Sequence, residues 1–222
     1  MLLLALDTAS PAVTVAVHDG TSVLASDLFV DARRHGELVA PMVQRVLTVA
    51  GVAPRELTDL AVGVGPGPFT GLRVGLVSAR TMAAVTGARL VGVCSLDVVA
   101  RAYLDRAPAG SGAGAPGLVV ATDARRGEVH WATYDRAGAR LDGPGVARAA
   151  DLASRLVPGT VAVGRGAQLY ANVLPAVDGP LDPDAAVLAA VVVAGTVPLL
   201  AANPLYLRRP DAAPPGTPRP VP

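Results

Sequence analysis

An internal repeat is the feature of this sequence that most limits the folds it can adopt. Residues 4–19 align without a gap on residues 120–135, at an offset of 116 positions. Both copies read as an apolar strand that ends at an aspartate, followed by a turn and a second strand. The identical pairs are Ala5/Ala121, Asp7/Asp123, Val13/Val129, Ala16/Ala132 and Asp19/Asp135. A chain that repeats such a unit is expected to form two related α/β lobes.

The remaining patterns divide the chain into four parts. We expect a first lobe over residues 1–105, a linker rich in glycine, alanine and proline over 106–117, a second lobe over 118–210 and a flexible tail over 211–222. Strands are predicted at 2–6, 12–18, 22–30, 60–64, 89–93, 118–122, 128–134 and 160–164. Helices are predicted at 35–50, about 70–86, 95–105, near 146–156 and near 183–195. We also expect Pro41 in the first turn of its helix and Thr70 as an N-cap.

Composition excludes several classes of protein. Hydrophobic residues make up 51% of the chain and charged residues 17%, so the chain is not disordered. The net charge of +1 is not that of a free-standing nucleic-acid binder. The sequence contains no lysine, which excludes a Schiff-base lysine and a P-loop lysine.

The expected compartment follows from cysteines and apolar runs. Cys94 is the only cysteine, so no internal disulfide and no cysteine zinc site can form. The apolar N-terminus reaches Asp7 too soon for a signal peptide, and Gly195 and Pro198 interrupt the longest apolar stretch. We therefore expect a cytoplasmic protein with no membrane contact.

The aspartates at the two strand ends are the strongest candidates for chemistry. A carboxylate beside a tight turn can hold a magnesium–phosphate group, which makes Asp7, Thr8 and Asp123 a weak nucleotide site. The alternative is that each aspartate caps its own turn. The duplicated unit resembles the actin, sugar-kinase and heat-shock ATPase fold. Ala9 stands where active ATPases of that fold usually carry glycine.

The histidines do not form a metal motif. None of His18, His35 and His130 has a second histidine four residues later, so a helical metal pair is absent and we expect no bound metal. Three arginine pairs occur, Arg33-Arg34, Arg125-Arg126 and Arg208-Arg209. Each is either solvated surface or a contact to RNA or a partner.

The helices predicted at 35–50 and 70–86 have more apolar and small surface than one core contact needs. The first carries two adjacent apolar rows, and the second carries a row of small residues. We predict that they form a partner surface made of His35, Leu38, Met42, Arg45, Val46, Val49, Thr70, Gly71, Arg73, Val74, Gly75, Ser78 and Met82. A large residue at Gly75 should then block pairing and leave the lobe folded. The alternative is that both helices are enclosed within the lobe.

Several segments together resemble the TsaB (YeaZ) family. The most specific is Gly65–Gly75, which reads Gly-Pro-Gly-Pro-Phe-Thr-Gly-Leu-Arg-Val-Gly. Residues 4–10, 34–38, 95–97, 123–129 and 204–210 are similar, in order, to other segments of the family. The resemblance covers residues 2 to about 212, nearly the whole chain.

The resemblance implies a two-lobed fold of the actin-like, ribonuclease H-like type with a reduced second lobe. It implies a non-catalytic paralogue of TsaD, the transferase that places a threonylcarbamoyl group on tRNA beside the anticodon. TsaD has a metal-binding histidine pair on its helix, whereas the matching helix here has only His35. TsaD would be the partner, TsaE a further ATPase partner, and a homodimer an alternative pairing. ATP and metal would lie on the partners, and tRNA would be reached through the complex. An active ATPase or small-molecule kinase and a metallopeptidase-like protein remain the alternatives.

Overall fold

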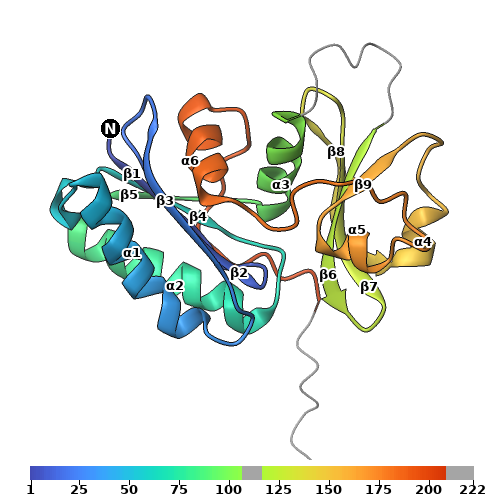
Figure 1. Cartoon of the computed structure of the whole chain (residues 1–222), viewed down its shortest axis with the longest axis horizontal. Coiled ribbons are helices and arrows are strands. Elements are labelled where there is room, and N and C mark those ends of the chain that lie inside the picture. The colour runs from blue at the N-terminus through green and yellow to red at the C-terminus, as the bar shows by residue number, and fades with distance from the viewer. Residues whose placement is uncertain (107–116, 209–222) are drawn as a thin grey trace, which may run out of the picture.

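Two sheets form the framework of the protein (Figure 1). The computed structural model describes residues 1–106 and 117–208. Most of the predicted linker 106–117 and the whole predicted tail 211–222 therefore lie outside the described residues.

The first sheet has five strands in the order β3-β2-β1-β4-β5. They are β1 (Leu3–Asp7), β2 (Ala12–His18), β3 (Val23–Val30), β4 (Asp59–Gly63) and β5 (Arg89–Val93). β1 runs antiparallel to β2 and parallel to β4. All side chains of β1 and β2 are buried, because helices cover both faces of this sheet.

The second sheet repeats the plan of the first with four strands in the order β8-β7-β6-β9. They are β6 (Leu118–Arg125), β7 (Glu128–Tyr134), β8 (Arg140–Arg148) and β9 (Val161–Val163). β6 runs antiparallel to β7 and parallel to β9, as β1 does to β2 and β4. The repeat thus marks the equivalent strands of two sheets and confirms the α/β fold class. β8 was not predicted, because its central Gly143-Pro144 reads as a turn.

Two long helices cover one face of the first sheet. α1 (His35–Ala50) and α2 (Phe69–Thr86) pack on the side chains of Leu4, Leu6 and Leu60. Gly51 and Gly87 end these helices in the left-handed conformation. A short 3₁₀ helix, η1 (Pro54–Glu56), links α1 to β4.

Two details of the helix starts differ from the prediction. α1 begins at His35, so Pro41 lies inside the helix and not in its first turn. α2 begins at Phe69 with Pro68 in the N-cap position, and no side chain caps it, so Thr70 is not the N-cap. Pro68 has an extended ψ of 132° and a φ of −58°, which brings the chain directly into the helix one residue earlier.

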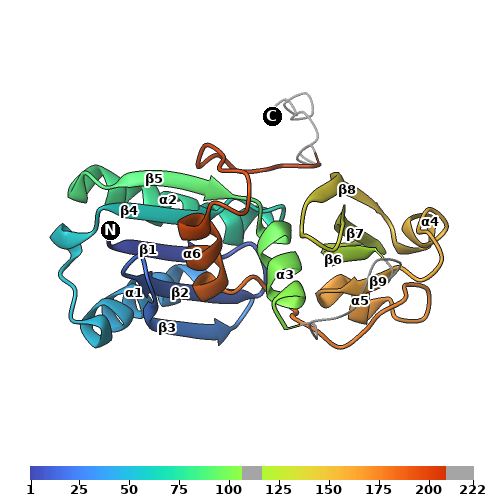
Figure 2. The same cartoon turned by 90° about the horizontal axis from the view of Figure 1, so that it is seen from above.

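Two helices are exchanged between the halves of the chain (Figure 2). α3 (Ser95–Leu104) belongs to the first half, yet its Leu96 and Val99 pack on Leu118 of the second sheet. α6 (Ala185–Ala194) belongs to the second half, yet it covers the free face of the first sheet. The predicted second lobe, 118–210, is therefore wrong at its C-terminal end, because this segment returns to the first sheet.

The segment after α6 stays with the first sheet. Leu200 and Gly92 exchange two backbone hydrogen bonds of 2.8 Å, and the Leu205 amide donates to the Val64 carbonyl at 2.8 Å. Two short helices, α4 (Ala149–Ala153) and α5 (Arg165–Leu169), cover the outer face of the second sheet. Among the described helices, none is long and apolar enough to span a bilayer.

Candidate functional site

Asp7 lies at the end of β1 and is enclosed by its own lobe. It is 1% exposed. Its Oδ1 accepts the Ala9 amide at 2.6 Å, and its Oδ2 accepts the Ser95 hydroxyl at 2.6 Å. Burial raises the pKa of Asp7 to about 6, against the smaller opposing effect of these hydrogen bonds. The carboxylate therefore joins β1 to the start of α3 and does not face an open cavity.

Thr8 inserts its hydroxyl into the hydrogen-bond ladder of α2. The hydroxyl donates to the Gly71 carbonyl at 2.8 Å and accepts the Gly75 amide at 3.0 Å. In an uninterrupted α-helix the Gly75 amide would donate directly to the Gly71 carbonyl. The insertion needs glycine on the helix, because a Cβ at Gly75 would lie 2.4 Å from Thr8 Oγ1 and a Cβ at Gly71 2.8 Å from the Thr8 carbonyl.

This placement corrects two predictions from the sequence. Asp7 and Thr8 are wrong as nucleotide contacts, because both are buried and their oxygens are engaged within the protein. Gly71 and Gly75 are wrong as partner contacts, because both are buried and a Cβ on either would meet Thr8. A large residue at Gly75 would disturb the lobe itself, so it does not test an interface.

The predicted partner surface is divided by the structure. His35, Met42 and Val46 are buried in the lobe, and the His35 Nε2 donates to the Ser10 carbonyl at 2.8 Å, so these three are also wrong as partner contacts. The residues that stay exposed or half-buried are Leu38, Arg45, Val49, Thr70, Arg73, Val74, Ser78 and Met82. Val77 and Val85 on α2 are 60% and 81% exposed. We name these ten residues the partner face.

Asp123 occupies the place of Asp7 in the second lobe but is only half-buried, with 22% of its side chain exposed. Its Oδ1 accepts the Arg125 amide at 2.8 Å, the same local turn that Asp7 makes with Ala9. Its Oδ2 lies 3.4 Å from the Arg125 guanidinium. Arg125 and Arg126 follow with positive φ values of 65° and 57°, which the turn imposes. Of the three predicted nucleotide residues, Asp123 lines a cavity between the lobes.

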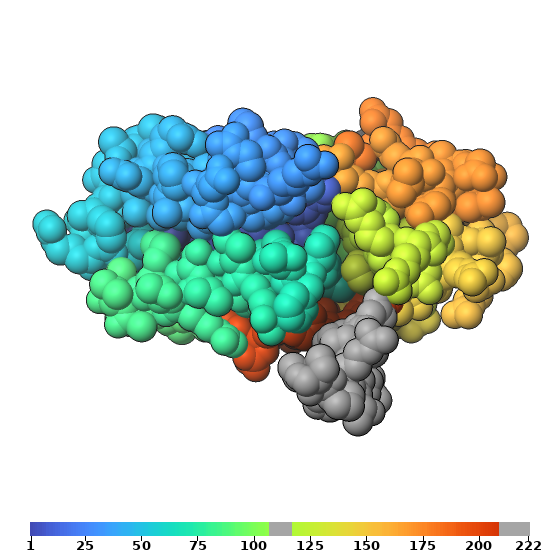
Figure 3. Space-filling view, turned by 90° about the horizontal axis from the view of Figure 1, so that it is seen from below, coloured from blue at the N-terminus to red at the C-terminus, as the bar shows by residue number. Residues whose placement is uncertain are grey.

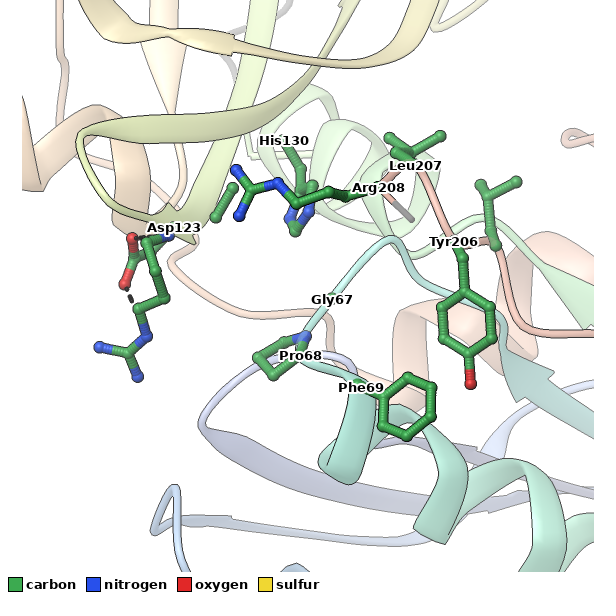
Figure 4. A pocket seen from close by; sticks show the side chains of 11 residues that line it. Gly67, Pro68, Phe69, Asp123, His130, Tyr206, Leu207 and Arg208 are labelled. Atoms are coloured by element: carbon green, nitrogen blue, oxygen red, sulfur yellow. Dashed lines mark hydrogen bonds and ion pairs between the residues drawn. The ribbon is translucent and has the colours of Figure 1, made fainter. Parts of the chain in front are cut away.

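That cavity, of about 350 Å³, lies between the two lobes (Figure 4). Its walls come from the loop before α2, the end of β6, β7 and the C-terminal segment. The lining residues are Gly67, Pro68, Phe69, Asp123, Ala124, Arg125, His130, Leu205, Tyr206, Leu207 and Arg208. Arg208 forms an ion pair with Glu128, so the C-terminal segment connects the first sheet to the second.

His130 is the titratable group that the sequence patterns missed at this cavity. Burial lowers the pKa of His130 to about 4, so the imidazole is neutral. Its Nδ1 has no hydrogen-bond partner within the described residues, and neither has the hydroxyl of Thr122 on the neighbouring strand. No sequence signal pointed to His130, because a lone histidine in a strand is usually structural. Within the residues described, no three His, Cys, Asp or Glu side chains form a metal-binding group.

An aromatic pair closes one side of the cavity. Phe69 stacks on Tyr206 with ring centroids 5.2 Å apart, and the Arg73 guanidinium carbon lies 3.8 Å from the Phe69 centroid. The Arg73 Nε also donates to the Tyr206 hydroxyl at 3.0 Å. Phe69 and Tyr206 remain 45% and 39% exposed, so they offer aromatic surface at the rim.

Comparisons with known proteins point to one group. The family model for TsaD, tRNA N6-adenosine threonylcarbamoyltransferase, matches residues 29–190. An uncharacterized protein of Mycobacterium tuberculosis is 41% identical over 218 residues, which cover 96% of this chain and 94% of that protein. The Escherichia coli tRNA threonylcarbamoyladenosine biosynthesis protein TsaB is 38% identical over 137 residues, which cover 61% of this chain and only 56% of TsaB. The structure of YeaZ from Pseudomonas aeruginosa is similar with a TM-score of 0.75 and 30% identity, covering 93% of this chain and 99% of that one.

Proposed function

Because the chain belongs to the TsaB (YeaZ) family and has a role in the biosynthesis of tRNA threonylcarbamoyladenosine, we propose that it acts as a non-catalytic partner of a TsaD-like transferase. In this role it binds the transferase and supports transfer of the threonylcarbamoyl group. We place this reaction in the cytoplasm.

The partner face is the observation that carries this proposal. Val49, Val77 and Val85 are 71%, 60% and 81% exposed on two long helices that lie side by side. An exposed apolar face on packed helices is typical of a protein–protein interface. Two helices of the partner could pack on α1 and α2 and exclude water from these valines.

A non-catalytic role is supported by the state of Asp7, Thr8 and His35 in this chain's first lobe. Asp7 and Thr8 are enclosed, and the His35 imidazole is bound to the Ser10 carbonyl. Val39 stands four residues after His35, where a helical metal pair would need its second histidine. The groups that could bind phosphate or metal in a catalytic relative are thus used here to hold the lobe together.

The same proposal assigns the other partners. A TsaE-like ATPase joins the pair, and ATP and metal are bound by the partner subunits. tRNA reaches this chain within the complex. In the absence of the transferase, the partner face of one copy pairs with that of a second copy as a homodimer.

Analytical ultracentrifugation with the TsaD-like protein of the same organism tests the proposal. Val49→Glu with Val77→Glu should weaken association at least tenfold, because two charges would be buried at the interface. Val157→Glu on the second lobe, where the valine is 70% exposed, is the matched control. Association that survives the double substitution, or magnesium-dependent ATP turnover by the chain alone, would contradict the proposal.

A further inference from the structure

A second cavity, of about 370 Å³, lies where the starts of α1 and α2 meet the hairpin between β6 and β7 (Figure 3). Its lining residues are Ser10, Pro11, Ala32, Arg33, His35, Gly36, Pro68, Thr70, Gly71, Val74 and Arg125. They include two arginines, one from each half of the chain, and no carboxylate. Such a lining suits an anion.

Arg33 is the arginine at this cavity that is free to bind a ligand. It is exposed, and in the described part of the chain its guanidinium forms no ion pair and no hydrogen bond. The nearest carboxylates along its own segment are already engaged, because Asp31 accepts the Arg33 amide and Glu37 pairs with Arg34. A phosphate that entered the cavity would meet an unpaired cation.

Arg125 faces Arg33 from the second lobe. Its side chain is 69% exposed, and its ion-pair partner among the described residues, the Asp123 carboxylate, lies 3.4 Å away. At this distance and exposure the pair is weak, so Arg125 can turn toward a stronger anion at little cost. Asp123 offsets part of the positive charge on its side of the cavity, whereas the Arg33 side has no such offset.

The cavities at Arg33 and at Phe69 are neighbours. Pro68 and Arg125 line both the 370 Å³ cavity at Arg33 and the 350 Å³ cavity at Phe69 and Tyr206. We name these two adjoining cavities together the inter-lobe groove. One end offers guanidinium groups, and the other offers the exposed aromatic rings of Phe69 and Tyr206.

This combination matches the chemistry of a nucleic-acid strand. Guanidinium groups bind backbone phosphates, and exposed aromatic rings accept unpaired bases by stacking. We infer that the inter-lobe groove binds a single-stranded segment of RNA, with phosphate between Arg33 and Arg125 and a base near Phe69 and Tyr206. The inference rests on the proposed function, in which tRNA is the substrate of the complex.

The position of the groove fits that assignment. Thr70 and Val74 belong both to the groove and to the partner face. An RNA held by a partner on α1 and α2 would therefore lie next to the groove. The net charge of +1 is no obstacle, because two arginines line the cavity without a carboxylate and the partner can supply the rest of the RNA-binding surface.

Binding of an unmodified tRNA transcript to the complex with the TsaD-like transferase tests the inference. Arg33→Ala with Arg125→Ala should weaken RNA binding roughly tenfold and lower the slope of log affinity against log salt by about 0.7, the value for one neutralised phosphate of a single strand. Arg55→Ala with Arg155→Ala is the matched control, because it removes one exposed arginine from each half of the chain outside the groove. Equal losses in both double variants would overturn the groove as an RNA site.

Two further arms separate the other occupants. Association with the transferase is first measured without RNA. If the unsubstituted chain does not associate, the proposed function is refuted. If only the Arg33/Arg125 variant fails to associate, the groove is a protein-binding surface. ATP and inorganic phosphate are then added as competitors. If micromolar ATP displaced the RNA from the groove, the groove would be a nucleotide site and the inference would be overturned.

A cross-link identifies the occupant directly. Cys94 is fully buried, so a cysteine at exposed Ala32, in the wall of the groove, would be the reactive thiol of the described chain. Ala32→Cys labelled with benzophenone should form an ultraviolet cross-link to the tRNA in the assembled complex. A cross-link to the transferase alone would refute the inference.

Discussion

The two lobes carry the same aspartate at the end of the same strand and use it in opposite ways. Asp7 is 1% exposed and is bound by Ser95, while Asp123 faces the inter-lobe groove beside Arg125. The local turn is the same, since each Oδ1 accepts the amide two residues on. What differs is the element that follows: Ser95 of α3 closes over Asp7, whereas no hydroxyl of the described residues bonds Asp123. A repeated motif therefore fixes the backbone but not the chemistry.

Among the tests of this difference between the two lobes, a substitution at Gly75 is expected to have the largest effect on stability. Gly75→Leu should lower the free energy of unfolding by about 3 kcal/mol or more, because its Cβ would meet Thr8 Oγ1 at 2.4 Å and displace α2 from β1. Denaturant unfolding measures this loss. Gly36→Ala on α1, where a Cβ meets nothing within 4 Å, is the control and should be neutral. A stable Gly75→Leu protein would mean that the first lobe is not closed around Thr8.

The next effect concerns the ionisation of Asp7. The pKa of Asp7 is about 6 in the folded state and 3.8 as the ordinary value, so the folded state keeps a proton that the unfolded state loses. The stabilisation is complete below pH 3.8 and is lost as the pH rises through about 6, which amounts to about 3 kcal/mol.

Unfolding curves of the wild type and Asp7→Asn between pH 4 and pH 8 measure this difference. The wild type should lose stability relative to Asp7→Asn as the pH rises. Asp123→Asn, on the open lobe, should change stability by less than about 0.5 kcal/mol. Parallel wild-type and Asp7→Asn curves would show that Asp7 is not enclosed.

His130 gives the second lobe the opposite pH dependence. The pKa of His130 falls from 6.5 to about 4 on folding, so its contribution is present above pH 6.5 and is lost as the pH falls toward 4. With allowance for partial exposure, the loss is about 2 kcal/mol. His130→Gln should remove it, as measured by unfolding at pH 4.5 and pH 7. Equal losses on acidification in both proteins would contradict the prediction.

The smallest effect lies where α3 meets the second lobe. The Tyr134 hydroxyl donates to Asp97 Oδ1 at 2.7 Å, and Arg140 donates to Oδ2 at 3.1 Å. Tyr134→Phe should cost about 1–2 kcal/mol, because buried Asp97 then keeps only one of these donors. Ser95→Ala, at the other attachment of α3, is the matched variant. A neutral Tyr134→Phe would show that α3 is held by packing alone.

The sequence was sufficient for the strands that the repeat marks and for the two long helices. It was not sufficient to say which side of α2 faces its own lobe. A row of small residues indicates close approach, but the approaching group, here the Thr8 hydroxyl, comes from a turn more than sixty residues earlier in the chain. Apolar periodicity on α1 likewise left Met42 and Val46 as surface candidates although they belong to the core.

The inter-lobe groove could not be predicted from the sequence for a related reason. Arg33 and Arg125 were visible as parts of two arginine pairs, but only the fold brings them to one cavity. His130 carried no motif, and Tyr206 lies in the family-like segment 204–210 but was not predicted as a site residue. The exchange of α3 and α6 was not predicted either. The sequence of α6 is apolar all round, which indicates burial, but the choice between the two sheets is made by tertiary packing.

That exchange sets the order in which the chain can become compact on the ribosome. The five strands of the first sheet are complete once β5 has emerged from the ribosome. Leu3, Ala5 and Ala61 can pack on Leu188 and Ala189 only after α6 has been synthesised. One apolar face of the sheet therefore stays bare while the whole second sheet is being synthesised. A chain that ended before α6 would have a destabilised first lobe, although that lobe is synthesised first. Chaperones that bind nascent chains should bind this uncovered face of the first sheet.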